Sequence, residues 1–190
     1  DIENSRYLMS FGADFLSTWV SPVRYARGYG EFRQGGHSRG VHVQVDSRFS
    51  MTAANADEWV PVRPGGEGIL AMSMIYVIIK EGLGHTEAGE LLTAGKGYQS
   101  LESFKPDDAD VFEATGISAE RITDLARTFA DPGNQPSLAI GGGSAGAHTS
   151  GLFNMSAIYS LNLLVGNVGK DGGVIFTPLS PLEDLAKQEV

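Results

Sequence analysis

Two spacings of apolar residues alternate along the chain, one typical of strands and the other of helices. Short apolar runs that stop at a glycine, an aspartate or a turn predict buried strands at residues 7–11, 41–45, 59–62 and 137–140. Apolar positions that recur every three to four residues predict helices at residues 22–33, 69–80, 118–130 and about 152–165. Gly35-Gly36 predicts a break after the first helix, and the glycines within residues 82–106 permit only short helices there.

Strands that alternate with helices predict an α/β fold, with a mostly parallel sheet flanked by helices as in nucleotide-binding (Rossmann-like) domains. In such sheets, ligands bind outside the carboxyl ends of the strands. The segments to inspect for a site are therefore residues 12–18, 46–48, 64–67 and 141–148. We expect residues 1–177 to form a single domain, and residues 178–190 to be a C-terminal tail or the start of a further segment.

The amino-acid composition argues against several classes of function. The formal net charge of -9 argues against a nucleic-acid partner, which would require a basic face. The chain has no cysteine and so supplies no cysteine ligand to an iron–sulfur cluster. The longest apolar stretch, residues 69–79, is shorter than the roughly 20 residues that span a bilayer, so we expect no direct membrane insertion. The N-terminus has no signal peptide and both ends resemble cuts, so we expect an excised piece of a longer chain.

Three strand ends carry candidate binding residues. Gly12-Ala13-Asp14 follows the first strand, where backbone N–H groups could hold a phosphate, although such a glycine is also common in a simple turn. Asp46 and Arg48 follow the second strand and could bind a ribose, a base or a phosphate, or could be ordinary turn residues. The segment 64–67 precedes the most apolar helix, and its Glu67 could accept from the two-donor edge of guanine or only cap the helix.

The segment 141–146 reads G-G-G-S-A-G and matches the G-x-G-x-x-G fingerprint of dinucleotide-binding proteins. The acidic residue expected about 20 positions later falls near Asp171, in a glycine-rich loop where no strand is expected, so a nicotinamide-binding module is a weak alternative. The four histidines are scattered, and His148 is the only one at an expected strand end. The sequence therefore predicts no catalytic constellation and no metal site.

Taken together, the motifs resemble those of the molybdopterin oxidoreductases related to dimethyl sulfoxide reductase. The resemblance extends over nearly the whole chain and rests on the motifs at residues 10–18, 45–48, 56–67, 115–126, 141–143 and 161–173. Residues 19–33 are most similar to the branch that handles polysulfide, thiosulfate or tetrathionate. The resemblance implies a fragment of a catalytic subunit that holds the guanosine diphosphate arm of a molybdopterin guanine dinucleotide in a bis-molybdopterin molybdenum cofactor. The redox chemistry would then take place elsewhere in the full chain, and the fragment alone would be inactive.

The resemblance also implies roles for individual residues. It assigns cofactor binding to Gly12, Ala13, Asp14, Ser17, Thr18, Asp46, Arg48, Pro64, Gly65 and Glu67. The family more often has Asn where Asp14 stands, Pro at Phe15 and Ser47, and Asp at Glu67, so Asp14 adds a charge near the phosphate and Glu67 lengthens the acceptor arm.

Several expectations about the full protein follow from the same resemblance. A 4Fe–4S cluster would be held in a region upstream of this chain. The partners would be the other domains of the same chain, an iron–sulfur electron-transfer subunit and a membrane quinone-linked subunit. The location would be a periplasmic or membrane-associated complex. A sister branch of the family supplies an alternative, a cofactor-free scaffold subunit of a quinol-oxidising respiratory complex.

Overall fold

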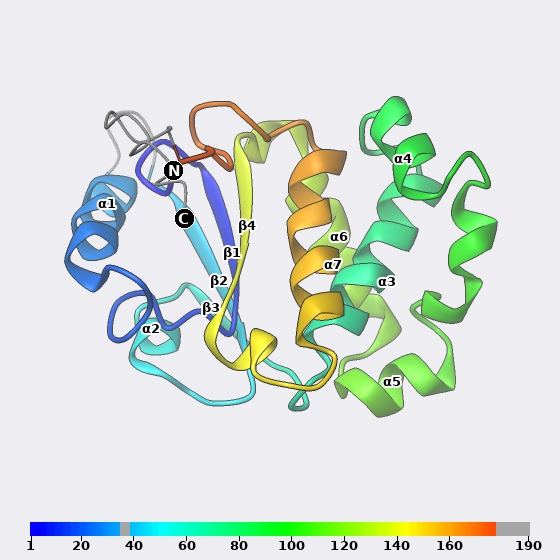
Figure 1. The fold of residues 1–190 in the computed structure, drawn as a ribbon, viewed down its shortest axis with the longest axis horizontal. Coiled ribbons are helices and arrows are strands. Elements are labelled where there is room, and N and C mark those ends of the chain that lie inside the picture. Colours follow the sequence, from blue (N-terminus) through cyan, green and yellow to red (C-terminus); the bar gives the residue numbers. More distant parts are fainter. Residues whose placement is uncertain (35–38, 178–190) are drawn as a thin grey trace, which may run out of the picture.

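The computed structural model describes residues 1–34 and 39–177, and its centre is a four-stranded parallel sheet (Figure 1). The strands are β1 (Tyr7–Phe11), β2 (Val41–Asp46), β3 (Glu58–Pro61) and β4 (Ser137–Gly141). Their order across the sheet is β3-β2-β1-β4, and every neighbouring pair is parallel. The expected α/β fold with a parallel sheet flanked by helices is confirmed.

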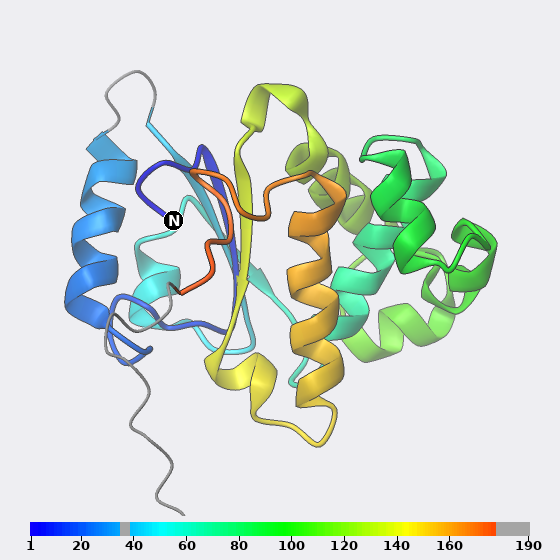
Figure 2. The same ribbon diagram turned by 45° about the horizontal axis from the view of Figure 1, so that its top comes forward.

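Helices cover both faces of this sheet, and a further group of helices lies outside one of the two layers (Figures 1 and 2). On one face lie α1 (Pro22–Gln34) and the short α2 (Met51–Ala54). On the other face lie α3 (Glu67–Lys80), α6 (Ala119–Ala130) and α7 (Gly151–Leu164). The outer group contains α4 (Thr86–Leu92), a 3-10 helix (Tyr98–Phe104) and α5 (Ala109–Thr115). Two shorter 3-10 helices span Pro132–Asn134 and Gly143–Gly146.

The two faces of the sheet bury different side chains, as the alternation along each strand requires. Met9 and Phe11 of β1 join the larger core, which packs the sheet against α3, α6 and α7. Leu8 faces the opposite way and joins a smaller core formed with α1. Helix α3 is apolar nearly all round because it lies between the sheet-facing helices and the outer group.

The path of the chain creates a switch in direction at the middle of the sheet. From β1 the chain adds β2 and then β3 on one side, with α1 crossing one face. It then passes through α3 to α6 on the opposite face and adds β4 on the other side of β1. The loops that follow β1 and β4 therefore diverge towards opposite faces, which leaves a crevice at their carboxyl ends.

The expected strands and long helices are confirmed, with ends that differ by one or two residues. Two short helices, α2 and α5, were not expected from the apolar pattern. The break at Gly35-Gly36 and the tail at 178–190 lie outside the described residues. Within the described part of the chain, no helix is long and apolar enough to cross a membrane.

Candidate functional site

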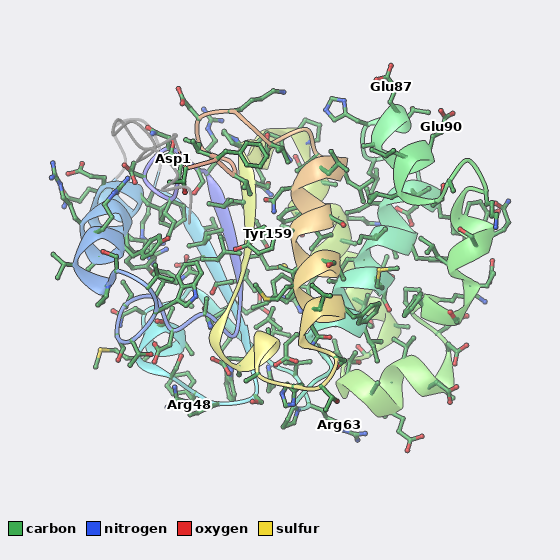
Figure 3. The ribbon with its side chains drawn as sticks, viewed as in Figure 1. Asp1, Arg48, Arg63, Glu87, Glu90 and Tyr159 are labelled. Atoms are coloured by element: carbon green, nitrogen blue, oxygen red, sulfur yellow. The ribbon has the colours of Figure 1, made fainter. Side chains whose placement is uncertain are left out.

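A polar cavity of about 360 Å³ opens at the carboxyl edge of the sheet, where the β1 and β4 loops diverge. Arg48 marks this edge, and Arg63, which follows β3, lies along the same side of the molecule (Figure 3). Segments that are far apart in the sequence meet here, and the lining residues are Gly12, Asp14, Thr18, Trp19, Asp46, Ser47, Arg48, Gly143 and Ser144. Five of the ten residues to which the resemblance assigns cofactor binding are in this lining: Gly12, Asp14, Thr18, Asp46 and Arg48.

Asp46 lies at the end of β2, is 3% exposed, and meets only hydrogen-bond donors. Its Oδ1 accepts from the backbone N–H of Arg48 at 3.2 Å and from the Ser144 hydroxyl at 3.4 Å. Its Oδ2 accepts from the side-chain amide of Gln44 at 3.4 Å. An ionised carboxylate offers about four lone-pair positions, so three internal donors leave room for one donor from a ligand.

The carboxylate of Asp14 is turned towards the protein and ties the β1 loop to α2. Its Oδ1 accepts from the hydroxyl of Thr52 at 2.6 Å and from the Thr52 backbone N–H at 3.3 Å. Its Oδ2 lies 3.3 Å from the guanidinium of Arg48, whose side chain is 72% exposed. Asp14 therefore partly neutralises Arg48, the one cation among the described residues of the cavity lining, while most of the Arg48 side chain stays exposed to solvent.

The glycine that follows β1 is required by close packing between two loops. Gly12 has φ +66°, and a Cβ on it would lie 2.7 Å from the backbone nitrogen of Ala145. The Gly12 N–H donates to the Val45 carbonyl, and the N–H groups of Ser17 and Thr18 both donate to the Asp14 carbonyl. These three amides are thus already hydrogen-bonded within the chain. Ala13 is fully buried, and Ala13 and Ser17 are not part of the cavity lining.

Four lining residues were not among the expected site residues: Trp19, Ser47, Gly143 and Ser144. The Trp19 ring stacks on Tyr25 at 4.9 Å between centroids and covers Gly142, where a Cβ would come within 2.8 Å of the indole. A Gly-rich turn after β4 was visible in the sequence and pointed to Gly143 and Ser144. No spacing signal marked Trp19, because its position depends on how the β1 loop folds back over β4.

The Pro64–Glu67 segment lies at the start of α3 and is not part of the cavity lining. Glu67 is the first residue of α3 and is fully buried, and neither carboxylate oxygen has a hydrogen-bond partner among the described residues. Desolvation raises the pKa of this carboxyl, while the nearby backbone N–H groups of Glu67 and Gly65 and the interaction with His148 partly oppose that shift. A Cβ on Gly65 would lie 3.7 Å from the imidazole of His148, so the His148 loop covers this segment.

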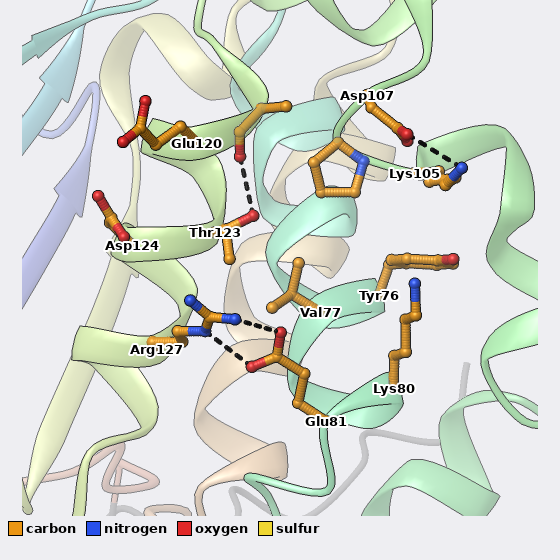
Figure 4. Close-up of a pocket in the computed structure, with 12 residues that line it drawn as sticks. Tyr76, Val77, Lys80, Glu81, Lys105, Asp107, Glu120, Thr123, Asp124 and Arg127 are labelled. Carbon is orange, nitrogen blue, oxygen red and sulfur yellow. Dashed lines mark hydrogen bonds and ion pairs between the residues drawn. The ribbon is translucent and has the colours of Figure 1, made fainter.

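The molecule also has a larger groove of about 440 Å³ between α3 and α6, away from the sheet edge (Figure 4). Its charged side chains largely pair with one another. Arg127 makes two 2.8 Å bonds to Glu81, and Lys105 lies 3.0 Å from Asp107. Among the described residues, Lys80, Glu120 and Asp124 also line this groove and form no ion pair, so its unpaired charges are of both signs.

Within residues 1–34 and 39–177, no group of three or more His, Asp or Glu side chains is placed to hold a metal ion. The described site is a polar cavity at the switch point of a parallel sheet. The buried acceptor Asp46 lies at its floor, and the exposed side chain of Arg48 lies at its rim. These features define an α/β domain with a Rossmann-like parallel sheet and a cavity at its switch point.

Comparison with known proteins identifies the family. The family model described as molybdopterin oxidoreductase matches residues 1–184, so the chain belongs to the molybdopterin oxidoreductase family.

Among individual relatives, the chain is 30% identical to a menaquinone reductase molybdopterin-binding-like subunit from Nitratidesulfovibrio vulgaris, over 95% of this chain and 25% of that protein. It is 28% identical to the dimethyl sulfoxide reductase of Escherichia coli, over 91% of this chain and 23% of the relative. It is 27% identical to the molybdopterin-containing subunit of an arsenate respiratory reductase from a Shewanella species, over 96% and 23%.

A solved structure supports the fold. Acetylene hydratase from Pelobacter acetylenicus superposes with a TM-score of 0.68 at 22% sequence identity, covering 87% of this chain and 22% of that enzyme. The chain spans about a quarter of the length of the curated relatives that it matches. Several of these relatives are named as reductases or as subunits of reductases.

Proposed function

We propose that this domain holds the guanosine diphosphate arm of a molybdopterin guanine dinucleotide in a catalytic subunit whose redox chemistry takes place elsewhere. The observation that carries the proposal is the position of the polar cavity at the switch point between β1 and β4. Parallel α/β sheets bind nucleotides at this place because adjacent loops diverge there. A cavity of about 360 Å³ falls within the roughly 300–1,000 Å³ typical of small-molecule sites.

The chain's own residues would bind and orient the nucleotide, while the molybdenum held by the pterin would supply the oxygen-atom or electron transfer chemistry when bound. Asp46 would accept a hydrogen bond from a ribose hydroxyl or a base N–H, since it has capacity for one more donor. Arg48 would reach the diphosphate with its exposed guanidinium. Thr18 and Trp19 would contribute a hydroxyl and an aromatic face to the same cavity.

Glu67 would recognise the guanine edge, whose two N–H donors match the two oxygens of a carboxylate. Its oxygens lack partners in the described structure, as a buried acceptor awaiting donors would. Because Glu67 lies outside the cavity lining, this contact requires the loop around His148 to move away from Gly65. Pro64 and Gly65 would present the same segment to the base.

A second candidate, a cofactor-free scaffold subunit of a quinol-oxidising respiratory complex, is favoured by the charge of the cavity. Among the described lining residues, the carboxylates of Asp14 and Asp46 outnumber the guanidinium of Arg48. The resulting negative potential would repel a diphosphate. The 30% identical relative from Nitratidesulfovibrio vulgaris is named molybdopterin-binding-like. The scaffold would keep the fold and the contacts with its neighbours and hold no cofactor.

A nicotinamide-binding module receives little support. In the dinucleotide fingerprint the glycine loop opens directly into the helix that faces the pyrophosphate. Here Gly143–Gly146 forms a 3-10 helix, and α7 begins only at Gly151. The position about 20 residues later lies in α7 or the loop that follows it, where no strand presents an acidic residue.

The full protein would assemble with an iron–sulfur electron-transfer subunit and a membrane quinone-linked subunit, in a periplasmic or membrane-associated complex. Its 4Fe–4S cluster would lie in a region upstream of this domain. The names of relatives as subunits and reductases support this assignment, as does the coverage of about a quarter of their length, which leaves room for other domains of the same chain.

Titration with GDP at millimolar concentration, followed by calorimetry, tests the proposed function. We expect saturable binding that Asp46→Asn weakens by about tenfold, since the variant replaces one acceptor oxygen of a charged group with a donor. Thr123→Ala, on α6 and lining the separate groove, is the matched control and should leave the affinity unchanged. Absence of GDP binding, together with absence of molybdenum and pterin in the purified full-length protein, would favour the scaffold instead.

A further inference from the structure

Three polar residues alternate on the α1 side of β2, a strand that is covered on both faces. His42 and Gln44 are fully buried and Asp46 is 3% exposed, while Val43 and Val45 face the larger core. Buried strands of parallel sheets are usually continuous apolar runs, because each buried polar group must find a partner. A row of three such residues leading to the cavity floor therefore has to be explained.

The three side chains form a continuous hydrogen-bonded chain along β2, and Tyr29 of α1 lies beside its His42 end. The Tyr29 hydroxyl lies 3.2 Å from Nδ1 of His42 and 2.6 Å from the carbonyl of Asn55. Nε2 of His42 lies 3.3 Å from Oε1 of Gln44, and Nε2 of Gln44 donates to Oδ2 of Asp46 at 3.4 Å. The aromatic ring of Phe15, 5.4 Å from the imidazole between centroids, helps to enclose the chain.

The direction of this chain follows from its carboxylate end. An ionised carboxylate only accepts, so Gln44 must present its NH₂ group to Asp46 and its carbonyl oxygen to His42. His42 must then carry its proton on Nε2 in order to donate to that oxygen. Burial lowers the pKa of His42 to about 4, which keeps the ring neutral at physiological pH and leaves Nδ1 as an acceptor. The single proton of the Tyr29 hydroxyl then goes either to Nδ1 or to the Asn55 carbonyl, which is the nearer acceptor at 2.6 Å.

We propose that Gln44 is a positioning residue that fixes the Asp46 carboxylate for ligand binding, and that His42 fixes the amide of Gln44 from behind. This inference rests on the proposed function, because the ligand of Asp46 is the nucleotide proposed above. Gln44 holds Oδ2, while the Arg48 backbone and Ser144 hold Oδ1, so the carboxylate cannot rotate without breaking contacts on both oxygens. Its remaining acceptor position is thereby directed before the ligand arrives, which reduces the entropy lost on binding.

The first test needs no ligand. In the protein labelled with ¹⁵N and ¹³C, nuclear magnetic resonance should show His42 as the neutral tautomer with its proton on Nε2. Gln44→Met has a similar length and removes both amide contacts, so it should shift the His42 Nε2 resonance and the Asp46 carboxyl resonance together. Val43→Ala, a buried change on the opposite face of the same strand, should leave both resonances in place. A His42 protonated on Nδ1 or on both nitrogens at neutral pH, or resonances unmoved in Gln44→Met, would overturn the proposal.

The second test measures the consequence for binding. Gln44→Met should weaken GDP affinity by about tenfold, the value of one hydrogen bond to a charged group, while Val43→Ala should retain wild-type affinity. Equal affinity of Gln44→Met and the wild type would overturn the positioning role. If the wild type binds no GDP, the proposed function fails, and the resonances of His42 and Asp46 still decide whether Gln44 links them.

Discussion

The side chain of Asn162, on α7, closes part of the open edge of the sheet. Its Oδ1 accepts from the Ala139 N–H and its Nδ2 donates to the Ala139 carbonyl, both at 2.8 Å. Because β4 is an edge strand, these backbone groups have no neighbouring strand on that side. One buried side chain therefore replaces a pair of ladder hydrogen bonds and joins α7 to the sheet.

Asn162→Ala should destabilise the fold by about 3 kcal/mol, since it leaves two buried backbone groups without partners and each costs roughly 1–3 kcal/mol. Urea unfolding followed by circular dichroism measures the loss. Ser156→Ala, an exposed position on the same helix, is the control and should change the free energy of unfolding by less than about 0.5 kcal/mol. A loss for Asn162→Ala no larger than that of the control would mean that water replaces the amide at the edge.

Glu67 should make the fold less stable as the pH rises. Its folded pKa is raised by desolvation, so the folded state holds this proton more tightly than the unfolded chain does. The contribution of protonated Glu67 to the free energy of unfolding is fully present below the unfolded pKa of about 4.5. It is lost as the pH rises through the folded pKa of Glu67.

The matched variant is Glu67→Gln, which removes the ionisation and keeps the length of the side chain. We expect it to melt at a higher temperature than the wild type at pH 7 and at a similar temperature at pH 4. The same variant should weaken GDP binding, since the amide presents a donor where guanine needs an acceptor. A wild type that remains the more stable protein at pH 7 would contradict the unpaired burial of Glu67.

Single site residues were predictable where they directly follow a strand. The sequence predicted that Gly12 and Asp46 would lie at the carboxyl edge, and both line the cavity there, because parallel strands bring their carboxyl ends to one edge. The orientation of Asp14 was not predictable, because it depends on Thr52, 38 positions away in the sequence. The burial of Glu67 was also not predictable, because it is produced by the packing of α7 and the His148 loop over the start of α3.

At the scale of elements, the long amphipathic or apolar segments were predictable and the short ones were not. The α3 and α6 segments are long and rich in apolar residues, so a helix is the structure that their sequences favour over a strand or a loop. By contrast, α2 and α5 have four and seven residues, and each begins at a local cap supplied by Ser50 or Asp108. A helix this short is not stable by itself, so its existence depends on tertiary contacts that the sequence does not display.

The crossing of α3 and α7 depends on a glycine that allows close approach. A Cβ on Gly68 would overlap Oδ1 of Asn154 and would lie 2.7 Å from its Cα. Gly68→Ala should therefore push α7 away from α3 and cost about 1–3 kcal/mol, the usual range for overpacking. Thermal unfolding measures the effect.

Gly89→Ala in α4 is the matched control for the α3–α7 crossing. Its added Cβ would make only ordinary contacts, 3.5 Å or more from Ile79, and α4 would gain helix propensity. We expect this control to be neutral or up to about 1 kcal/mol more stable than the wild type. Equal effects of the two substitutions would show that the crossing accommodates a methyl group.

For the whole molecule, the parallel sheet was predictable but the order of its strands was not. Alternating strands and helices require right-handed crossovers and hence parallel neighbours. Whether β4 would pair with β3 or with β1 depends on the 75-residue connection, residues 62–136, that crosses the sheet through α3 to α6. Since this choice creates the switch point, the sequence predicted which loops to inspect without predicting which of them meet in one cavity.

The overall charge should shape how the molecule binds an anionic nucleotide. The chain carries a formal net charge of -9, and the cavity lining adds two carboxylates against one guanidinium. Both fields repel a diphosphate, and salt screens them, since the Debye length falls from about 30 Å at 0.01 M to about 8 Å at 0.15 M ionic strength. GDP affinity should therefore increase several-fold over this range, opposite in sign to the salt dependence of a nucleic-acid-binding protein.

Calorimetric titrations across ionic strength test this expectation, with neutral guanosine as the ligand control whose affinity should stay constant. Asp14→Asn keeps an oxygen for the Thr52 hydroxyl and removes one charge from the cavity, so it should bind GDP more tightly than the wild type at low salt and show a flatter dependence. GDP affinity that falls as salt is added would show that Arg48 and nearby backbone donors outweigh the acidic field. In that case the charge argument for a cofactor-free scaffold would lose its basis, and the nucleotide-binding role would be strengthened.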